Sequence, residues 1–258
     1  MRTLSFSRPA RVAILAVAAP LLILALGLVV KPGSGLAHSC AKDNELRFRA
    51  VDGTTLVGHR FGGTKPGKRT TVVLSHMSVG DLCQWTPYAR RLAAKGFFVF
   101  PFDFRGHGSS PGRQNHARAA ADVVAAVRAV RALGARKVVI GGASLGGIAV
   151  VIAAPKLGTA VQGVVAVSAP AAIAGELDAR PSAPRLRVPT LYLAAEEDQN
   201  APYDFAADAQ ALHDATGTSE KRVEIVPGSQ HGTFLVSSSA AGRALIERFL
   251  RDPAATVP

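Results

Sequence analysis

Aromatic residues and cysteines are scarce in this sequence. Aromatic side chains make up 6% of the 258 residues, and tryptophan occurs once. The core must therefore be built mainly from aliphatic side chains, which is usual for a protein that alternates strands and helices. Hydrophobic residues make up 48% of the chain, which is enough for one large domain. This composition excludes an intrinsically disordered, collagen-like or repeat protein.

Acidic residues are also few relative to basic ones. The chain has 30 lysines and arginines against 18 aspartates and glutamates, a formal net charge of +12. A basic surface attracts anionic lipid headgroups, cell-wall polymers and acidic substrates, so association with a membrane or the cell wall is left open. No basic run is interleaved with aromatic residues, and nucleic acid is therefore not an expected partner. The sequence does not indicate an oligomeric state.

The beginning of the chain has the pattern of a targeting segment. It reads "MRTLSFSRPAR", with three arginines and no acidic residue, and an unbroken apolar stretch follows from Val12 to Val30. This pattern predicts a signal peptide over residues 1–37, cleaved after Ala37. Because the apolar stretch approaches the roughly 20 residues that span a bilayer, an uncleaved membrane anchor is the alternative. Both alternatives predict an extracytoplasmic protein, secreted or anchored, with its domain over residues 38–258.

The two cysteines are Cys40 and Cys83. An oxidising compartment allows them to form one disulfide that ties the start of the mature chain to the domain, and two free thiols are the alternative. Neither cysteine lies in a metal-ligand spacing, and no cluster of histidines and acidic residues supplies one. The sequence therefore predicts no metal site.

The remaining sequence alternates predicted strands with predicted helices. Two alternating runs joined by Asp52-Gly53 predict a β-hairpin. Short, continuous runs of β-branched and aromatic residues follow, such as "TTVVLSH", "FFVFPFDF" and "KVVIGG", with helical patterns between them. Continuous apolar strands separated by helices indicate an α/β fold with a mostly parallel central sheet and helices on both faces.

A lone serine separates one predicted strand from the helix that follows it. The sequence Gly142-Ala143-Ser144-Leu145-Gly146 has the pattern G-x-S-x-G in this strand-to-helix context. We expect Ser144 to occupy a strained turn that lifts its hydroxyl above the sheet, with Gly142 and Gly146 required because larger side chains would collide. The turn also directs the Leu145 N–H and the start of the helix at the space above Ser144, where negative charge is stabilised.

A serine nucleophile needs a base, and the base needs a carboxylate that orients it. In this architecture the acid and then the histidine follow later strands. The strand "PTLYLAAEEDQNAP" ends in three carboxylates, of which we predict Asp198 as the acid, with Glu196 and Glu197 as alternatives. His231, in the loop after the last predicted strand, is the predicted base.

A second N–H for a developing oxyanion is expected from the loop "HMSVGD". We predict the backbone of Ser78, or alternatively Met77, as this donor, with the His76 ring bracing the loop. In "DFRGHGSSPG" we expect Arg105 and His107 to fix a sharp turn by hydrogen bonds. The sequence contexts of the other histidines indicate surface positions; they are His38, His59, His116 and His213.

From about Glu45 to Arg251 the chain resembles the α/β-hydrolase family. The resemblance rests on four motifs in order: "GASLGG" at the nucleophile, "DFRGHGSS", "EEDQNAP" at the acid and "GSQHGTF" at the histidine. It implies an eight-stranded, mostly parallel sheet and ester-type hydrolysis by the domain at 38–258, with no cofactor. Many members have His-Gly in the oxyanion loop, whereas this chain has His76-Met77, which leaves the second oxyanion donor open.

The substrate class is less well specified by the sequence. Members of this family usually insert a lid after the strand that follows the nucleophile helix, and here too few residues follow Pro170 to form a cap domain. A site without a lid favours small or surface-borne esters with short to medium acyl groups. We therefore expect a secreted carboxylesterase. The alternatives are a serine peptidase, thioesterase or acyltransferase on the same fold, and a catalytically silent binding module.

Overall fold

The computed structural model describes residue 40 and residues 44–256. The predicted signal peptide or anchor at 1–37, with its cleavage after Ala37, lies outside the described residues. The described residues belong to a unit that spans 32–258. Among them, no helix has both the length and the apolar composition needed to cross a membrane.

A central sheet of eight strands organises the domain, in the order β1-β2-β4-β3-β5-β6-β9-β12. Its strands are β1 (Glu45–Arg49), β2 (Thr55–His59), β3 (Thr70–Ser75), β4 (Phe98–Asp103), β5 (Lys137–Ala143), β6 (Gly163–Val167), β9 (Thr190–Ala195) and β12 (Lys221–Val226). β2 runs antiparallel to β1 and to β4, and all other neighbours are parallel. The prediction of an eight-stranded, mostly parallel sheet is confirmed.

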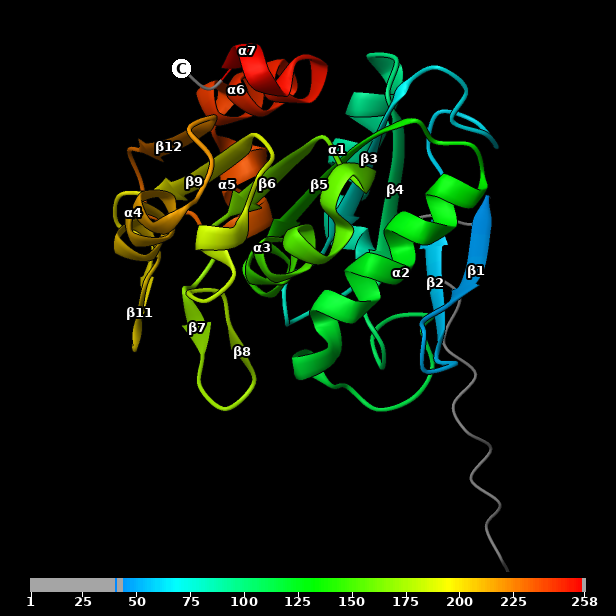
Figure 1. Ribbon diagram of the computed structural model, residues 1–258, viewed down its shortest axis with the longest axis horizontal. Helices are drawn as coiled ribbons and strands as arrows, with labels where there is room; N and C mark the ends of the chain where they lie inside the picture. The colour runs from blue at the N-terminus through cyan, green and yellow to red at the C-terminus, as the bar shows by residue number, and fades with distance from the viewer. Residues whose placement is uncertain (1–39, 41–43, 257–258) are drawn as a thin grey trace, which may run out of the picture. The chain divides into compact units, whose positions relative to one another are not determined.

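Helices pack on both faces of this sheet, as the sequence predicts. They are α1 (Thr86–Ala94), α2 (Ala119–Ala132), α3 (Leu145–Leu157), α4 (Phe205–Ala215), α5 (Gly232–Ser238), α6 (Ala240–Arg251) and α7 (Pro253–Thr256), with short 3₁₀ helices η1 (Leu82–Trp85), η2 (His116–Arg118), η3 (Gly158–Ala160) and η4 (Ala183–Arg185). Buried side chains of α2, α3 and α4 form one apolar core with the sheet, and those of α1, α5 and α6 form another. Figure 1 shows α2 and α3 in front of the strands.

The burial of each element explains its residue pattern. β5 is buried along nearly its whole length, and its apolar run is therefore continuous, whereas β1 at the sheet edge alternates between exposed and half-buried positions. α3 contains glycine, valine and isoleucine, which are weak helix formers, and nine of its 13 positions are buried. Tertiary packing rather than intrinsic propensity therefore holds α3 in place behind Ser144.

The segment between β6 and β9 is the one in which this fold would accommodate a cap. It contains only the short hairpin of β7 (Ala172–Ile173) and β8 (Leu177–Asp178), followed by η4. After β9 a second two-stranded ribbon forms from β10 (Gln199–Asn200) and β11 (Tyr203–Asp204). The described segment between β6 and β9 therefore holds no cap domain.

The three described histidines assigned to the surface, His59, His116 and His213, are all at least partly buried. His59 at the end of β2 is 2% exposed, so that prediction is wrong. The side chain of His116 is 23% exposed and lines the main pocket of the domain. Both residues stand in polar sequence, and their burial comes from distant segments of the chain that local sequence does not reveal.

Candidate active site

Ser144 lies at the sharp turn between β5 and α3. Its backbone has φ of 53° and ψ of −115°, a left-handed φ that is unfavourable for any residue with a Cβ. Two hydrogen bonds hold the turn: the Ser144 N–H donates to the Val167 carbonyl at 2.9 Å, and the Ser144 carbonyl accepts from the Ile148 N–H at 3.0 Å. The backbone strain is thus fixed by β6 on one side and by the first turn of α3 on the other.

Glycine on either side of Ser144 is a steric requirement. A Cβ at Gly142 would overlap the backbone of Gly146, and a Cβ at Gly146 would overlap the backbone of Ser75 in β3. The contacted atoms belong to backbone, so they cannot move aside as a flexible side chain would. The two glycines therefore allow β5, α3 and β3 to approach closely enough for Ser144 to stand above the sheet edge.

His231 and Asp198 come from two different loops and form a hydrogen-bonded pair. His231 Nδ1 lies 2.9 Å from Asp198 Oδ1 and 3.0 Å from Oδ2. The Asp198 side chain is buried and that of His231 is 32% exposed, whereas the neighbouring Glu196 and Glu197 are exposed. Because Nδ1 faces a carboxylate, it carries the ring proton in the neutral form, and Nε2 is left as a free base.

Two further contacts hold the histidine loop in position. The Phe205 ring packs against the His231 ring with centroids 4.4 Å apart. The Gly232 N–H donates to Ser168 Oγ at 2.9 Å, and Ser168 is itself a buried residue with a left-handed φ of 46°. Ser168 follows β6 and is a part of the site that sequence analysis missed. No local motif marks it, since its partner is 64 residues away along the chain.

His76 braces the loop after β3, as the sequence predicts, and His107 adds a contact to the same loop that the sequence does not predict. His76 Nε2 accepts from the Phe104 N–H at 3.0 Å, so Nδ1 carries the proton and donates to the Met77 carbonyl at 2.6 Å. His107 is positioned between two carbonyls, with Nδ1 3.0 Å from Arg105 O and Nε2 3.2 Å from Ser78 O. The loop carrying Ser78 is therefore tied to the sharp turn that follows β4.

The two predicted oxyanion donors in this loop differ in their hydrogen bonding. The Met77 N–H donates to Gln84 Oε1 at 3.0 Å and is therefore already engaged. The Met77 carbonyl points at the buried His76, and in a planar trans peptide the Ser78 N–H points the opposite way. Leu145 is the first residue of α3, where backbone N–H groups have no partner within the helix.

A buried ion-pair cluster stabilises the turn after β4. Arg105 Nη2 lies 2.6 Å from Asp122 Oδ1, and Arg105 Nη1 lies 2.8 Å from Asp52 Oδ2. Burial raises the pKa of Asp122, although its hydrogen bonds to Arg105 work in the opposite direction. The Arg105 guanidinium holds the pKa of Asp52 well below its usual range. These contacts fix Arg105 in the turn, as the sequence predicts.

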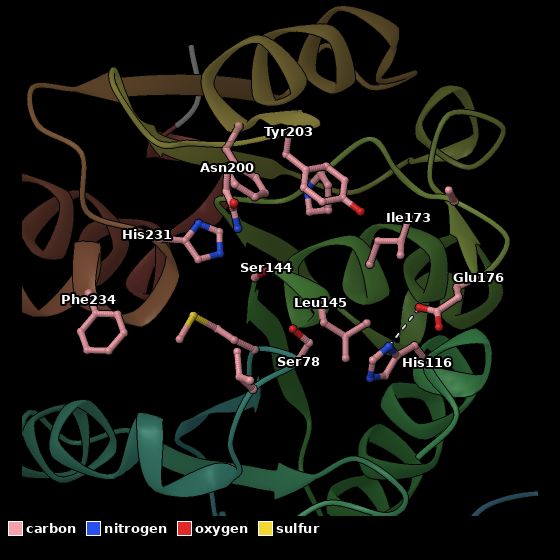
Figure 2. Close-up of a pocket in the computed structure, with 15 residues that line it drawn as sticks. Ser78, His116, Ser144, Leu145, Ile173, Glu176, Asn200, Tyr203, His231 and Phe234 are labelled. Atoms are coloured by element: carbon pink, nitrogen blue, oxygen red, sulfur yellow. Dashed lines mark hydrogen bonds and ion pairs between the residues drawn. The ribbon is translucent and has the colours of Figure 1, made fainter. Parts of the chain in front are cut away.

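A pocket of about 630 Å³ is lined by five of the predicted site residues: Ser144, His231, Leu145, Ser78 and Met77. Figure 2 shows Ser144 and His231 in it, with Ser78 and Leu145 beside Ser144. Two exposed apolar side chains stand in its wall, Val79 at 81% and Phe234 at 61% exposure. The remaining lining residues are mostly apolar: Met77, Pro170, Ile173, Ala174, Tyr203 and Phe205, with the polar His116, Glu176 and Asn200.

Neither the cysteines nor the acidic residues form a metal site in the described part of the chain. Cys40 and Cys83 are joined by a disulfide with Cα atoms 5.7 Å apart, so the alternative of two free thiols does not hold in the structure. Groups of three or more histidine, cysteine or acidic side chains suited to a metal ion are absent from residues 40 and 44–256. The pocket does contain groups suited to nucleophilic chemistry: the Ser144 hydroxyl and the His231 imidazole, which is hydrogen-bonded to the buried Asp198 carboxylate.

Comparison with known proteins agrees with this geometry. Residues 70–180, which run from β3 past Ser144 to the β7–β8 hairpin, match the family model described as alpha/beta hydrolase fold. The chain has the α/β-hydrolase fold, as the four motifs and the sheet order indicate.

Individual relatives and solved structures extend the comparison. Over 108 residues the chain is 32% identical to the uncharacterized protein YfhR of Escherichia coli (strain K12), a match that covers 40% of this chain and 38% of that protein. The esterase Pf2001 of Pyrococcus furiosus superposes with a TM-score of 0.69 at 16% identity, covering 82% of this chain and 92% of that one. The enol-lactonase of Burkholderia xenovorans LB400 gives 0.64 at 20% identity, covering 80% and 100%.

Proposed function

We propose that the protein is an exported serine hydrolase that cleaves carboxylic esters with short to medium acyl groups. The observation that carries the proposal is the hydrogen bond between His231 and the buried Asp198, in a pocket that also contains Ser144 on its strained turn. Ser144 and His231 line this pocket, Asp198 is hydrogen-bonded to His231, and the three residues follow one another along the chain in the order that a serine hydrolase of this fold requires. The similarity to the solved esterase concerns the fold and agrees with this assignment.

The proposed reaction begins with attack by Ser144 Oγ on the ester carbonyl. His231 Nε2 takes the hydroxyl proton, and Asp198 stabilises the imidazolium and keeps the ring in the required tautomer. The Ser144 Oγ–acyl carbon bond forms, and His231 returns the proton to the leaving alcohol as the carbon–oxygen bond of the ester breaks. Water, deprotonated by the same imidazole, then hydrolyses the acyl-enzyme and restores the Ser144 hydroxyl.

The negative charge on the tetrahedral oxygen is assigned to two backbone N–H groups. One is the Leu145 N–H at the start of α3, where the helix dipole adds to the hydrogen bond. The other is the Ser78 N–H, because the Met77 N–H is already engaged by Gln84. The chain departs from the His-Gly pattern at Met77, the residue before Ser78. The proposed donor is the backbone N–H of Ser78, which does not depend on the Met77 side chain.

Export is proposed from the N-terminal pattern and is supported by the Cys40–Cys83 disulfide, because such bonds persist in oxidising compartments. The substrate is proposed to be a small-molecule or surface-borne ester, since the pocket is open to solvent through a rim with exposed apolar side chains. A peptidase, thioesterase or acyltransferase would use the same three groups and differs in the acyl acceptor or leaving group. A silent binding module would keep the fold and lack turnover.

The test combines active-site labelling with a substrate panel. A fluorophosphonate probe should label the protein at Ser144, and Ser144→Ala should lose both labelling and ester turnover by about a thousandfold or more. Ser219→Ala is the matched control, because Ser219 is exposed in the turn before β12. A peptide p-nitroanilide, assayed beside p-nitrophenyl esters, separates peptidase from esterase. Ester hydrolysis that survives in Ser144→Ala would reject the proposal, and the absence of labelling in the parent would favour a binding module.

A further inference from the structure

His116 and Glu176 connect two segments that border the candidate active site. His116 is in η2, in the segment that leads into α2, and Glu176 is in the turn of the β7–β8 hairpin. His116 Nδ1 lies 3.0 Å from Glu176 Oε2, and Figure 2 shows this contact at the edge of the pocket. His116 Nε2 is buried with no hydrogen-bond partner among the described residues. The ring is therefore linked to the hairpin through one nitrogen only.

The same pair separates two cavities. His116 and Glu176 both line the pocket that contains Ser144, and both also line a second cavity of about 360 Å³. The rest of the second cavity is formed by Gln114, Asn115 and Ala117 from the segment before α2. The pair is thus a wall with the reaction site on one side and a second cavity, bordered by two amide side chains, on the other.

The position of this wall relative to Ser144 indicates which half of a substrate meets it. In Figure 2 His231 and Phe234 lie on one side of Ser144, and Leu145, Ile173, Glu176 and His116 lie on the other. On the proposed function, His231 must reach the oxygen of the leaving alcohol, so the alcohol occupies the His231 side. The acyl chain then extends past Leu145 and Ile173 toward the His116–Glu176 pair.

We propose that the His116–Glu176 pair is the end wall of the acyl-binding part of the pocket and limits the length of acyl chain that the enzyme accepts. An alkyl chain that reached the pair would have to displace it or remove water from a hydrogen-bonded carboxylate, and both are unfavourable. His116 is also kept in place by stacking on His107, with ring centroids 5.8 Å apart and planes at 28°. Removal of either partner opens the pocket into the second cavity.

This length limit rests on the proposed ester hydrolysis. One substrate series tests the two proposals, and its outcomes distinguish them. The measurement is kcat/KM for p-nitrophenyl esters of increasing acyl length, from acetate to palmitate, with the full chain. His116→Ala and Glu176→Ala should each raise kcat/KM for the longer esters relative to acetate by about tenfold or more, the gain expected from burying roughly two further methylene groups. Glu176→Gln, which keeps an acceptor for His116 Nδ1, should retain the parent profile.

The matched control is His213→Ala. His213 Nδ1 also lies 3.0 Å from a carboxylate oxygen, that of the exposed Asp214, but His213 is in α4 and is not among the residues that line the pocket. It should leave the chain-length profile unchanged. Parent-like profiles in both alanine variants would overturn the length limit while leaving the esterase assignment intact. Failure of the parent to hydrolyse any ester of the series would overturn the proposed function and the length limit together.

Discussion

His231 Nδ1 lies within 3.0 Å of both carboxylate oxygens of Asp198, while Glu196 and Glu197, next to Asp198 in sequence, point to solvent. Three acids in a row therefore have different environments, and only Asp198 is positioned to hold the imidazole. Its backbone contributes to this position, because the Asp198 carbonyl accepts from the Phe205 N–H at 3.1 Å and so connects the loop to the start of α4.

The first prediction concerns this choice of acid. Asp198→Asn should lower kcat/KM for an ester by about a thousandfold or more, because an amide stabilises neither the required tautomer nor the imidazolium. Glu196→Gln and Glu197→Gln should change it less than about twofold, since both side chains are exposed. Steady-state kinetics on the three purified variants make the comparison. Loss of turnover in either glutamine variant with Asp198→Asn active would move the acid upstream.

The second prediction concerns the close approach of α3 to β3. Gly146→Ala places a methyl group against the Ser75 backbone and should lower the free energy of unfolding by roughly 1–3 kcal/mol, with loss of activity as the Ser144 turn shifts. Gly141→Ala, in the neighbouring strand β5, is the control. Its added methyl would meet the flexible end of Leu74 at 3.2 Å, so it should cost less than about 1 kcal/mol. Denaturant unfolding measures both, and equal costs would contradict the steric explanation.

The third prediction concerns the bond between Cys40 and Cys83, which are 43 residues apart in sequence. Reduction should lower the free energy of unfolding by roughly 2–4 kcal/mol, because the unfolded chain regains the entropy of the loop that the bond closes. Mass spectrometry of non-reduced peptides should show the two cysteines linked. A Cys40→Ser/Cys83→Ser double variant that does not change on reduction is the control. Complete alkylation of both cysteines in the purified protein without reductant would show that the disulfide is absent.

The fourth prediction concerns how stability depends on pH through Glu247, which forms ion pairs with Arg91 and Lys95. Burial works to raise the pKa of Glu247, but hydrogen bonds from Lys95 and Arg91 outweigh it, and the pKa lies below its ordinary value of 4.5. A lowered carboxylate pKa means that the stabilisation is present above about pH 4.5 and is lost as pH falls through the folded-state pKa.

The stability difference between the parent and Glu247→Gln should therefore shrink as the pH is lowered from about 6 to roughly 3. Urea denaturation across that range measures it. Glu220→Gln serves as control, because Glu220 is exposed before β12 and has no ion pair among the contacts of the described residues. A difference between the parent and the Glu247→Gln variant that stays constant with pH would show that the cluster contributes through packing rather than charge.

The main features of the fold and site could be predicted because they depend on local patterns. Continuous apolar runs predict the buried parallel strands, and the glycines around Ser144 predict the turn because its geometry excludes other residues. The order of Asp198 and His231 after later strands follows from the topology. Asp198 could be preferred over its neighbours only weakly from sequence, since the burial that distinguishes it appears when β9, α4 and the histidine loop pack together.

Other site residues could not be predicted, because their roles depend on contacts between distant segments. Ser168 holds the histidine loop through a hydrogen bond to Gly232, yet "VSAP" resembles any strand end. His116 stands in polar sequence, and its partner Glu176 is 60 residues away, in a hairpin too short to be recognised from its pattern. Ser78, by contrast, is predicted from the sequence ahead of Met77, and the hydrogen bond of the Met77 N–H to Gln84, seven residues along the chain, supports that order.

The left-handed backbone of Ser144 and Ser168 has a consequence for adaptation to heat. Of the described non-glycine residues, three have a positive φ, and two of them are these serines at the ends of the neighbouring strands β5 and β6. Each such conformation costs roughly 1–3 kcal/mol. Substitutions that removed the positive φ at these two positions would stabilise the fold. They would also move the Ser144 hydroxyl out of position and remove the contact that holds the histidine loop. Lineages of this protein from hot environments should therefore gain their stability elsewhere in the sheet and keep both serines.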